Sequence, residues 1–514
     1  MSSTGSSSFS SGSASSARES VWLGESRDIP TDAFEPGAIY DEIIVGAGIT
    51  GLVTALLFAR QGRRVVVLEA RRIGAVTTGH STAKISQLQG TQLSKVRSHG
   101  YPALVRAYAD GNREAFDWLI DYAHSRHVPL ERRDAYTYAA TPGGIDRVER
   151  EYFLARSVGL SVRRLPGAPL PFRTFAATVL PDQAQVNPLD LLEALAAEVR
   201  ALGGRIVERS TVTGVHTRGN IAGVAVRAET TLGRVGASHV ILATGVPILD
   251  RGLYFAKVAA QRSYAQSFEV SASSLPDGMF LGVEQPTRSI RTYGNLLLTG
   301  GNGHPVGRVA SPQERADELT AWTQAQWPDA ELTHSWSAQD YSPVHHVPFV
   351  GWLPRGRGRI YLATGFDKWG MTNGVAAALT LSADILGSNT EWQKSLHHRV
   401  TMPRAIATGI GENAAVAWWY GKGYVSALGR SLPTVPPGEG EALVGRVGVS
   451  PTAVSTVDGE TCSLSALCSH LGAVVTWNDA EKSWDCPAHG SRFAADGTRL
   501  EGPAVRDLAR RKII

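Results

Sequence analysis

Apolar residues in the first part of the chain form short runs that end at glycine-rich turns. Residues Glu42–Val45 predict a buried strand, the Ala- and Leu-rich stretch through Arg60 predicts a helix, and Arg64–Glu69 predict a second strand. Two later runs, His239–Gly245 and Arg359–Gly365, are equally apolar and both end on Ala-Thr-Gly. Strands that alternate with a helix in this way predict an α/β fold around a parallel sheet.

A different pattern fills the region between the two Ala-Thr-Gly runs. Apolar and polar residues alternate over Gln261–Val270 and Thr287–Gly300, which predicts strands with one buried and one exposed face. We expect these strands to form an antiparallel sheet that faces the substrate. That sheet would interleave along the chain with the parallel one.

The two ends of the chain differ from this body. The tract MSSTGSSSFSSGSASS carries too little apolar surface to offset its ordering entropy, and we expect residues 1–37 to form a disordered Ser/Gly-rich tail. We assign residues 38–390 to the main body, 391–430 to a helical and Pro-rich linker, and 431–514 to a small C-terminal domain.

The linker has two parts of different character. Glu412–Tyr420 predicts an amphipathic helix that ends near Gly421, and we expect Trp418 and Trp419 to pack against the main body. The segment Pro433–Gly438 then stiffens the approach to the C-terminal domain.

The C-terminal domain contains the most specific chemical pattern. Cys468-Ser469-His470 is followed by Cys486-Pro487-Ala488-His489. Two Cys and two His in this order suit a [2Fe-2S] cluster in which one iron takes two thiolates and the other takes two imidazoles. A tetrahedral zinc site could use the same four residues, but zinc fingers pair Cys with Cys and His with His. The mixed half-sites therefore favour the iron-sulfur cluster, with Cys468, His470, Cys486 and His489 as its ligands.

The residues around these ligands resemble those of Rieske domains. Gly502-Pro503-Ala504 is similar to the family's proline loop, and Ser491 matches the serine that donates to a cluster sulfide. Ala473 and Ala488 stand where high-potential members have a disulfide, and Phe493 stands where they often have Tyr. The resemblance implies a small all-β domain whose cluster has a low or intermediate potential.

The first strand-helix-strand unit carries a dinucleotide signature. Gly46, Gly48 and Gly51 form G-x-G-x-x-G between strand and helix, where glycines permit close approach of the backbone to a pyrophosphate. Glu69 ends the second strand, at the place where a carboxylate binds ribose hydroxyls. The complete unit predicts a Rossmann-like nucleotide site.

Later motifs indicate which nucleotide. Gly365-Phe366-Asp367-Lys368-Trp369-Gly370-Met371 resembles the flavin-contacting motif of the glycine/D-amino acid oxidase (DAO) family, and Gln185–Leu192 resembles that family's helix start. The resemblance implies FAD, held in a Rossmann-like domain with an interleaved antiparallel substrate domain. The implied FAD-binding residues are Gly46, Gly48, Ile49, Thr50, Gly51, Glu69, Ala70, His80, Ser81, Thr82, Val212, Ala243, Thr244, Gly245, Gly365, Lys368, Trp369, Gly370, Met371 and Thr372.

A narrower likeness concerns the whole chain. Ser20–Trp22, Thr77–Lys84 and Trp336–Tyr341, together with the C-terminal domain, resemble a bacterial group of FAD-dependent oxidoreductases fused to Rieske domains. His80 lies in a T-T-x-H pattern similar to that of dimethylglycine and sarcosine dehydrogenases, where the His bonds covalently to the flavin. Two interpretations stay open for His80, a covalent bond and a non-covalent flavin contact.

The substrate site is predicted from single residues. The family holds carboxylate substrates with an Arg, often helped by a Tyr, and Arg262, Tyr264, Arg291 and Tyr293 are the candidates. His304 could act as acid or base, and Lys368 could place positive charge near the reduced ring. We take Arg291, His304, Lys368 and Tyr264 as the catalytic set.

Composition excludes several classes of protein. The net charge is +4 over 514 residues and the basic residues are scattered, so no nucleic-acid partner is expected. No apolar run approaches the roughly 18 residues of a membrane span. Three Cys provide no disulfide framework, which favours a reducing compartment and a cytoplasmic protein.

These features imply one function and leave two alternatives. The resemblance implies oxidation of a small amine, amino acid or hydroxy acid by hydride transfer to FAD, with electrons passed singly through the cluster to an external carrier or quinone. The alternatives are an oxygen-reducing oxidase with a regulatory Rieske domain, and an electron-transfer flavoprotein without an organic substrate. The chain lacks the Asp-x-x-His-x-x-x-x-His spacing of Rieske oxygenases.

Overall fold

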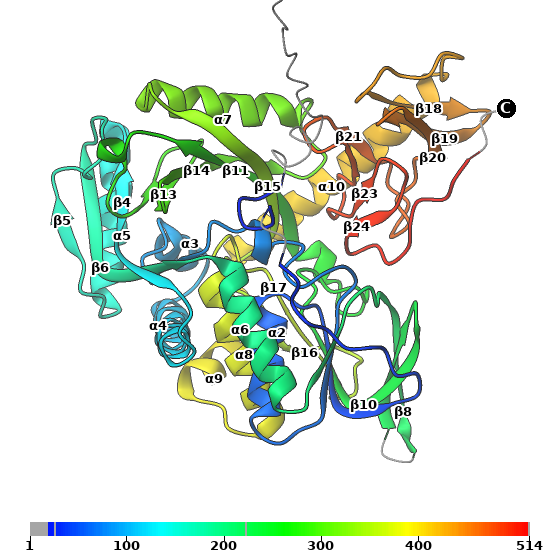
Figure 1. The fold of residues 1–514 in the computed structure, drawn as a ribbon, viewed down its shortest axis with the longest axis horizontal. Coiled ribbons are helices and arrows are strands. Elements are labelled where there is room, and N and C mark those ends of the chain that lie inside the picture. Colours follow the sequence, from blue (N-terminus) through cyan, green and yellow to red (C-terminus); the bar gives the residue numbers. More distant parts are fainter. Residues whose placement is uncertain (1–18, 25–26, 222–223, 512–514) are drawn as a thin grey trace, which may run out of the picture.

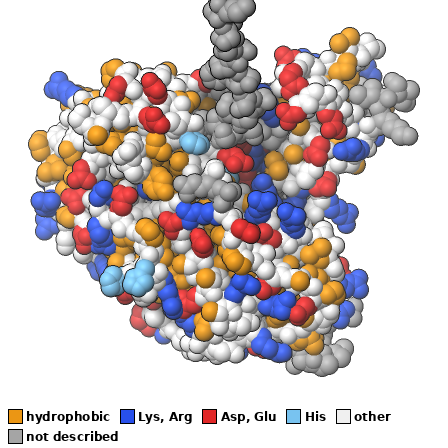
Figure 2. Space-filling model, viewed as in Figure 1, with side chains coloured by type: hydrophobic (Ala, Val, Ile, Leu, Met, Phe, Trp, Pro, Cys, Tyr) orange, Lys and Arg blue, Asp and Glu red, His pale blue; other side chains and the backbone are white. Residues whose placement is uncertain are grey.

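Two large sheets form the main body, and the C-terminal domain rests against both of them (Figure 1). The structure is a computed structural model that describes residues 19–24, 27–221 and 224–511. On the face shown in Figure 2, basic and acidic side chains are interspersed over the surface.

The first sheet has eight strands and a parallel centre. In the order β16-β17-β10-β1-β2-β7, the Ala-Thr-Gly strand β10 pairs with the first strand of the dinucleotide unit, and the other Ala-Thr-Gly strand, β17, pairs with β10. Strands β8 and β9 extend β10 as an antiparallel flap. The bounds are β1 Ile39–Val45, β2 Val65–Leu68, β7 Arg205–Val207, β8 Val212–Ile221, β9 Val224–Thr230, β10 Gly233–Leu242, β16 Phe349–Trp352 and β17 Ile360–Thr364.

Helices α2 (Ile49–Ala59), α6 (Pro188–Ala201) and α8 (Gly370–Leu386) lie side by side on one face of this sheet (Figure 1). Leu52, Leu56 and Leu195 are fully buried in the core that they share. Asn187 caps α6, since its side chain accepts a hydrogen bond from the N–H of Leu189. The predicted α/β fold is confirmed.

The second sheet has nine strands in the order β15-β11-β14-β13-β12-β4-β6-β3, with β5 beside β6. It is antiparallel except where β12 pairs with β4. Strands β3 to β6 come from before the first Ala-Thr-Gly run, so the interleaving is deeper than predicted. The bounds are β3 Lys84–Ile85, β4 Leu130–Ala139, β5 Arg163–Leu165, β6 Ala176–Val186, β11 Val258–Glu269, β12 Met279–Gly282, β13 Arg288–Tyr293, β14 Leu296–Pro305 and β15 Glu331–Pro343.

The other helices of the main body surround the second sheet and the junction between the two sheets. Helix α7 runs along the edge formed by β14, β11 and β15, while α3, α4, α5 and α9 pack near the junction. Their bounds are α3 Gln92–His99, α4 Pro102–Ser125, α5 Ile145–Ser157, α7 Pro312–Gln326 and α9 Glu391–His397, and the short 3-10 turns are η1 Thr78–His80, η2 Pro142–Gly144, η3 Tyr254–Ala256 and η4 Ala272–Ser274.

The C-terminal domain contains two small antiparallel sheets around its own apolar core. Trp484 and Phe493 are fully buried in that core. This arrangement confirms the predicted all-β domain. The strands are β18 Ala442–Val447, β19 Ser450–Val457, β20 Glu460–Ser465, β21 Thr476–Asn478, β22 Ser483–Asp485, β23 Arg492–Ala494 and β24 Arg499–Glu501.

The linker helix is longer than predicted. Helix α10 (Pro403–Gly429) continues through Gly421. Beyond that glycine, Tyr424 donates a hydrogen bond to the Gly472 carbonyl and so fastens the last turns of the helix to the C-terminal domain. Trp418 is 68% exposed, so its predicted packing against the main body is wrong. No helix among the described residues has the length and apolar character needed to cross a bilayer.

The predicted tail also needs correction. Residues 1–18 and 25–26 lie outside the described residues, but Ser20 and Trp22 are fully buried in the main body. Ser20 Oγ donates to the Gly79 carbonyl and Trp22 Nε1 to the Ser81 carbonyl. The apolar ring of Trp22 anchors this segment to the main body through its burial.

Candidate functional site

One cavity of about 440 Å³ joins the three parts of the molecule. Its wall begins at the carboxyl ends of β1 and β10 and continues across β11 and β14 of the second sheet. Residues from the C-terminal domain complete it on one side. A crevice at the carboxyl ends of parallel strands is the usual ligand position in such sheets.

Glycines allow the backbone to approach itself closely at the nucleotide end of this cavity. Gly46 has φ +107°, and a Cβ there would lie 2.5 Å from the Ala243 carbonyl oxygen. A Cβ on Gly51 would lie 1.9 Å from the Gly46 carbonyl oxygen. Only glycine fits at either position, so the turn brings the first N–H groups of α2 to the cavity wall.

Glu69 lies at the end of β2 and is held by backbone donors. Its carboxylate accepts hydrogen bonds of 2.8 Å from the N–H groups of Ala47 and Arg71. Burial raises the pKa of Glu69, while the two backbone donors act in the opposite direction. The carboxylate therefore has a fixed orientation at the wall, as a ribose partner requires.

The loop between β2 and β3 forms part of the cavity wall. Besides the bonds from Ser20 and Trp22, its His80 carbonyl accepts a 2.9 Å hydrogen bond from Trp336 Nε1. His80 Nδ1 lies 2.8 Å from the Val76 carbonyl, and burial lowers the pKa of this imidazole. A neutral His80 thus donates from Nδ1 and keeps Nε2 for another partner.

Most of the predicted FAD-binding residues meet at this one cavity. Gly51, Gly365 and Thr372 do not reach its wall: Gly51 packs against Gly46, Gly365 against Pro343, and Thr372 bonds to Gln89. The residues that line it are Gly46, Gly48, Ile49, Thr50, Glu69, Ala70, His80, Ser81, Thr82, Val212, Ala243, Thr244, Gly245, Lys368, Trp369, Gly370 and Met371.

The predicted arginine anchors do not line the cavity. Arg291 is 1% exposed, and its guanidinium donates to the carbonyls of Thr82, Ala83 and Val186. It therefore joins the loop between β2 and β3 to the second sheet. Arg262 is equally buried and pairs with acidic residues of the C-terminal domain.

Tyr264 and His304 form a hydrogen-bonded pair. Tyr264 lines the cavity, and its hydroxyl lies 2.9 Å from His304 Nε2. His304 Nδ1 lies 3.0 Å from the Pro305 carbonyl, and burial lowers the pKa of the imidazole. In the neutral ring, Nδ1 donates to the carbonyl and Nε2 accepts from Tyr264. The Tyr264 oxygen is left as an acceptor at the wall.

Lysines supply positive charge at the cavity wall that the two predicted arginines, Arg291 and Arg262, do not. Lys84, Lys95 and Lys368 all line the cavity. The backbone N–H of Lys368 donates to the Asp340 carboxylate, and burial raises the pKa of Asp340 to about 6. Burial lowers the pKa of Lys368. Lys368 was predicted, whereas Lys84 and Lys95 were missed.

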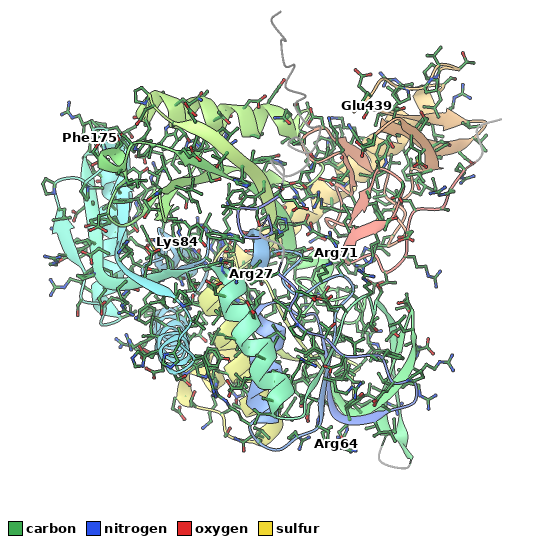
Figure 3. All side chains as sticks on the ribbon, viewed as in Figure 1. Arg27, Arg64, Arg71, Lys84, Phe175 and Glu439 are labelled. Atoms are coloured by element: carbon green, nitrogen blue, oxygen red, sulfur yellow. The ribbon has the colours of Figure 1, made fainter. Side chains whose placement is uncertain are left out.

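Lys84 is the most unusual of the three. Figure 3 shows it in the interior of the molecule, and its ammonium donates to the hydroxyls of Ser289 and Thr82. Burial, with a smaller effect from Arg291, lowers the pKa of Lys84 to about 7. A lysine directly after the Ser/Thr/His-rich loop was the signal in the sequence that could have identified it.

The four predicted cluster ligands lie on two facing loops. Cys468 and Cys486 are both buried, and contact between their thiols lowers the pKa of Cys468 to about 7. The rings of His470 and His489 lie 5.2 Å apart, and Nδ1 of each is buried without a partner among the described residues. Two thiols and two unpartnered imidazole nitrogens fit a [2Fe-2S] cluster of the Rieske type.

The surroundings of these loops match the predicted departures. Ser491 is fully buried and its Oγ accepts a 3.0 Å hydrogen bond from the Ala504 N–H, which leaves its own proton for another acceptor. Ala473 and Ala488 are buried small residues, and Phe493 packs its ring in the core.

The two histidines predicted as cluster ligands face the main body. His470 Nε2 lies 2.8 Å from Asp250 Oδ1, and the Phe255 ring lies 4.8 Å from that of His489. A short route continues inward: Gln339 Nε2 donates to the Gly490 carbonyl at 2.8 Å, and the Gln339 carbonyl accepts from Thr77 Oγ1 at 2.7 Å. Thr77 lines the cavity, so a single strand, β15 with Gln339, separates the cavity from the loop that contains Gly490.

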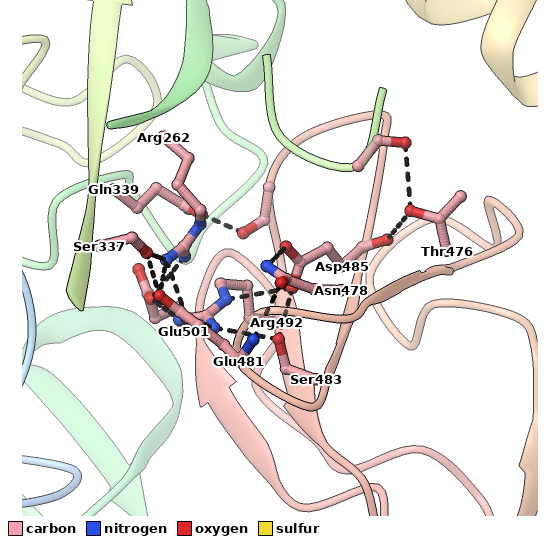
Figure 4. A network of polar contacts seen from close by, with 12 residues as sticks. Arg262, Ser337, Gln339, Thr476, Asn478, Glu481, Ser483, Asp485, Arg492 and Glu501 are labelled. Atoms are coloured by element: carbon pink, nitrogen blue, oxygen red, sulfur yellow. Dashed lines mark hydrogen bonds and ion pairs between the residues drawn. The ribbon is translucent and has the colours of Figure 1, made fainter. Parts of the chain in front are cut away.

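A buried ionic network fixes this docking (Figure 4). Arg262 of β11 pairs with Glu481 and Glu501 of the C-terminal domain, and Arg492 pairs with both of them and with Asp485. Burial acts to raise the pKa of Glu481, but the two arginines outweigh it and hold that pKa at about 2. Every charge in the network has an opposite partner, which suits a permanent contact.

Two family models match the chain. A model described as FAD dependent oxidoreductase (DAO) covers residues 41–383, and a model described as Rieske [2Fe-2S] domain covers residues 432–511. In addition, a curated protein of Bacillus subtilis (strain 168), "Putative Rieske 2Fe-2S iron-sulfur protein YhfW", is 30% identical over 508 residues, which are 96% of this chain and 98% of that protein.

Solved structures resemble the main body. Glycine oxidase from Geobacillus kaustophilus has a TM-score of 0.59 at 20% identity, over 69% of this chain and 96% of its own. L-proline dehydrogenase from P. horikoshii has a TM-score of 0.59 at 15% identity, over 70% of this chain and 96% of its own. At these identities the likeness concerns the fold.

Proposed function

Because this chain belongs to the FAD-dependent oxidoreductase (DAO) family and carries a Rieske [2Fe-2S] domain, we propose that it oxidises a small amine, amino acid or hydroxy acid and releases the electrons singly to an external acceptor. Bound FAD supplies hydride acceptance and the cluster supplies one-electron transfer. The acceptor would be a quinone or a small redox protein.

The route from Gly490 through Gln339 to Thr77 carries this proposal. Gly490 follows His489, a predicted cluster ligand, and Thr77 belongs to the wall of the cavity. Two hydrogen bonds and one residue therefore connect the two cofactor sites. The buried pairs of Arg262 and Arg492 keep this connection in one geometry.

Lys84 supports a substrate that carries a carboxylate. This half-buried ammonium has two hydroxyls as its hydrogen-bond partners among the described residues, and it gains from an anionic ligand because partial burial already disfavours its charge. Lys368 adds a second cation to the same wall. Its Nζ lies against Gly303, where an added Cβ would be only 2.8 Å from it. We assign the anchoring role to Lys84 in place of Arg291.

Tyr264 supports an N–H or O–H group on the same substrate. Its proton is directed to His304 Nε2, so its oxygen accepts a hydrogen bond from the substrate amine or hydroxyl. A carboxylate held at Lys84 and a donor held at Tyr264 would together fix the carbon between them. Such positioning favours 2-amino and 2-hydroxy acids.

The experiment is an anaerobic titration of the purified protein with amines, amino acids and hydroxy acids, in which flavin and cluster absorbance are followed separately. We expect 2-amino or 2-hydroxy acids to bleach the flavin first and the cluster second. Reduction of the cluster without bleaching of the flavin, by every compound tested, would sink the proposal.

A substitution at the cluster tests the direction of electron flow. In His489→Ala, substrate should still bleach the flavin, whereas turnover with an external acceptor should fall close to background because one iron ligand is lost. His398→Ala is the matched control, since that imidazole is exposed on the main body. Unchanged turnover in His489→Ala would contradict the outward route.

A further inference from the structure

The segment Arg499–Val505 of the C-terminal domain has two faces. On one face, Arg499, Leu500, Glu501, Gly502 and Val505 line the cavity of the main body. On the other face, the Ala504 N–H donates to Ser491 Oγ beside the cluster loops. The same few residues thus belong to the surroundings of both cofactor sites.

The segment Arg499–Val505 contacts the nucleotide end of the cavity. Arg499 Nη2 lies 3.4 Å from Thr211 Oγ1, and its guanidinium interacts electrostatically with the Glu69 carboxylate. A Cβ on Gly502 would lie 3.9 Å from the side chain of Ile248. Thr211, Glu69 and Ile248 all line the cavity, so the segment closes the part that contains the ribose-binding carboxylate.

Two observations indicate that a ligand completes this closure. Ser210 Oγ is fully buried at the cavity wall and has no partner among the described residues. Within the same described ranges, the only side-chain hydrogen bond of Arg499 is the long one to Thr211. A buried hydroxyl and a guanidinium with unused donors, both at the wall of one cavity, suit a ligand rich in hydroxyl and phosphate oxygens.

We propose that the C-terminal domain forms part of the FAD-binding site and that Arg499 binds the adenosine diphosphate portion of the cofactor. The nucleotide is held between the glycine turn and Glu69 on one side and the segment Arg499–Val505 on the other. The Rieske domain is therefore a permanent wall of the flavin site.

This assignment has a thermodynamic consequence. Because FAD contacts both domains, it binds the docked arrangement more tightly than an undocked one, and docking strengthens FAD binding by the same factor. Undocking of the C-terminal domain would remove a wall from the cofactor. The domain then transfers electrons from its docked position, without swinging away between reactions.

The test compares two arginines of the same region in the full-length protein. Arg499→Ala should raise the dissociation constant of FAD about tenfold, because charge-assisted hydrogen bonds are lost. Arg506→Ala removes the same charge from an exposed position off the cavity wall and should bind FAD as the parent does. FAD fluorescence measures the constant, and the electron paramagnetic resonance signal of the cluster reports an intact domain.

Two outcomes would overturn the proposal. One is unchanged FAD affinity in Arg499→Ala with a normal cluster signal. The other concerns hydrogen exchange, which needs no variant: added FAD should slow exchange at residues 499–505 and leave β18 and β19 unaffected. Equal exchange at 499–505 with and without FAD means that the segment does not contact the cofactor.

Discussion

The two ends of the cavity are built in different ways. At the nucleotide end, backbone atoms of the glycine turn form one part of the wall, and glycines such as Gly46 and Gly51 let them approach. At the substrate end, side chains from separate elements form it, among them Lys84 from β3 and Tyr264 from β11. Backbone recognition needs a local series of residue types, whereas side-chain recognition needs neighbours that only the tertiary fold provides.

The largest expected effect tests the backbone character of the nucleotide end. Gly51→Ala places a Cβ 1.9 Å from the Gly46 carbonyl oxygen, so the helix or the turn must move. We expect the free energy of unfolding to fall by about 3 kcal/mol and the variant to lose its bound FAD. Denaturant unfolding and the FAD content of the purified protein measure both effects.

A second helical glycine provides the matched control. No atom of the described residues lies within 4 Å of the Cβ position of Gly411 in α10, so Gly411→Ala should stabilise the protein by up to about 1 kcal/mol through helix propensity. Opposite signs for the same substitution would isolate the steric contact. Equal effects would mean that the turn is not closely packed.

Lys84→Met removes the proposed anchor at the substrate end. We expect affinity for a carboxylate substrate to fall about 10- to 100-fold, because a charge-assisted hydrogen bond is lost, while FAD affinity is unchanged. Anaerobic flavin bleaching against substrate concentration gives the affinity. Lys394→Met, at an exposed lysine of α9, is the control. If Lys84→Met lost FAD as readily as substrate, the two ends would not be separable.

The pH dependence sharpens the same distinction. With a pKa near 7, Lys84 is an ammonium below that pH and loses its proton as the pH rises through it. Carboxylate affinity of the free enzyme should therefore decline above pH 7, by up to about tenfold per unit. Lys84→Arg should move the decline to higher pH because a guanidinium stays protonated. An unshifted profile in Lys84→Arg would assign the titration to another group.

Tyr264→Phe should have the smallest effect. It removes the hydroxyl that bonds to His304 and, as proposed, accepts from the substrate, and we expect a loss of about 1 kcal/mol, or about fivefold in substrate affinity. Substrates that lack an N–H or O–H group should be affected less. Equal losses for both kinds of substrate would show that the tyrosine acts through packing alone.

The parts that could be predicted from sequence are those whose residues are close in the chain. The glycine turn lies within six residues, and each cluster half-site lies within four. Arg262 was predicted to bind substrate because a guanidinium matches a carboxylate. The carboxylates that it meets are Glu481 and Glu501, which lie more than two hundred residues away in another domain. No local pattern could indicate that pairing.

The N-terminal segment was missed for a related reason. A Ser/Gly tract predicts disorder by composition. Trp22, however, packs against the ring of Tyr293 and donates a hydrogen bond to the Ser81 carbonyl in the loop between β2 and β3. Composition averages over a segment and hides a single anchoring residue. The linker helix was ended too early for a different reason: Gly421 was taken as a helix end, whereas α10 continues to Gly429 and tolerates the glycine at a modest cost in helix propensity.

The wall formed by Arg499–Val505 has a consequence for the biogenesis of the protein. Synthesis proceeds from the N-terminus, so this segment leaves the ribosome after every other residue that lines the cavity. The Rossmann-like portion can fold earlier, but its cavity stays open until the iron-sulfur domain has been made and has docked. Full retention of the flavin is then a late step of maturation, which follows synthesis and docking of the C-terminal domain.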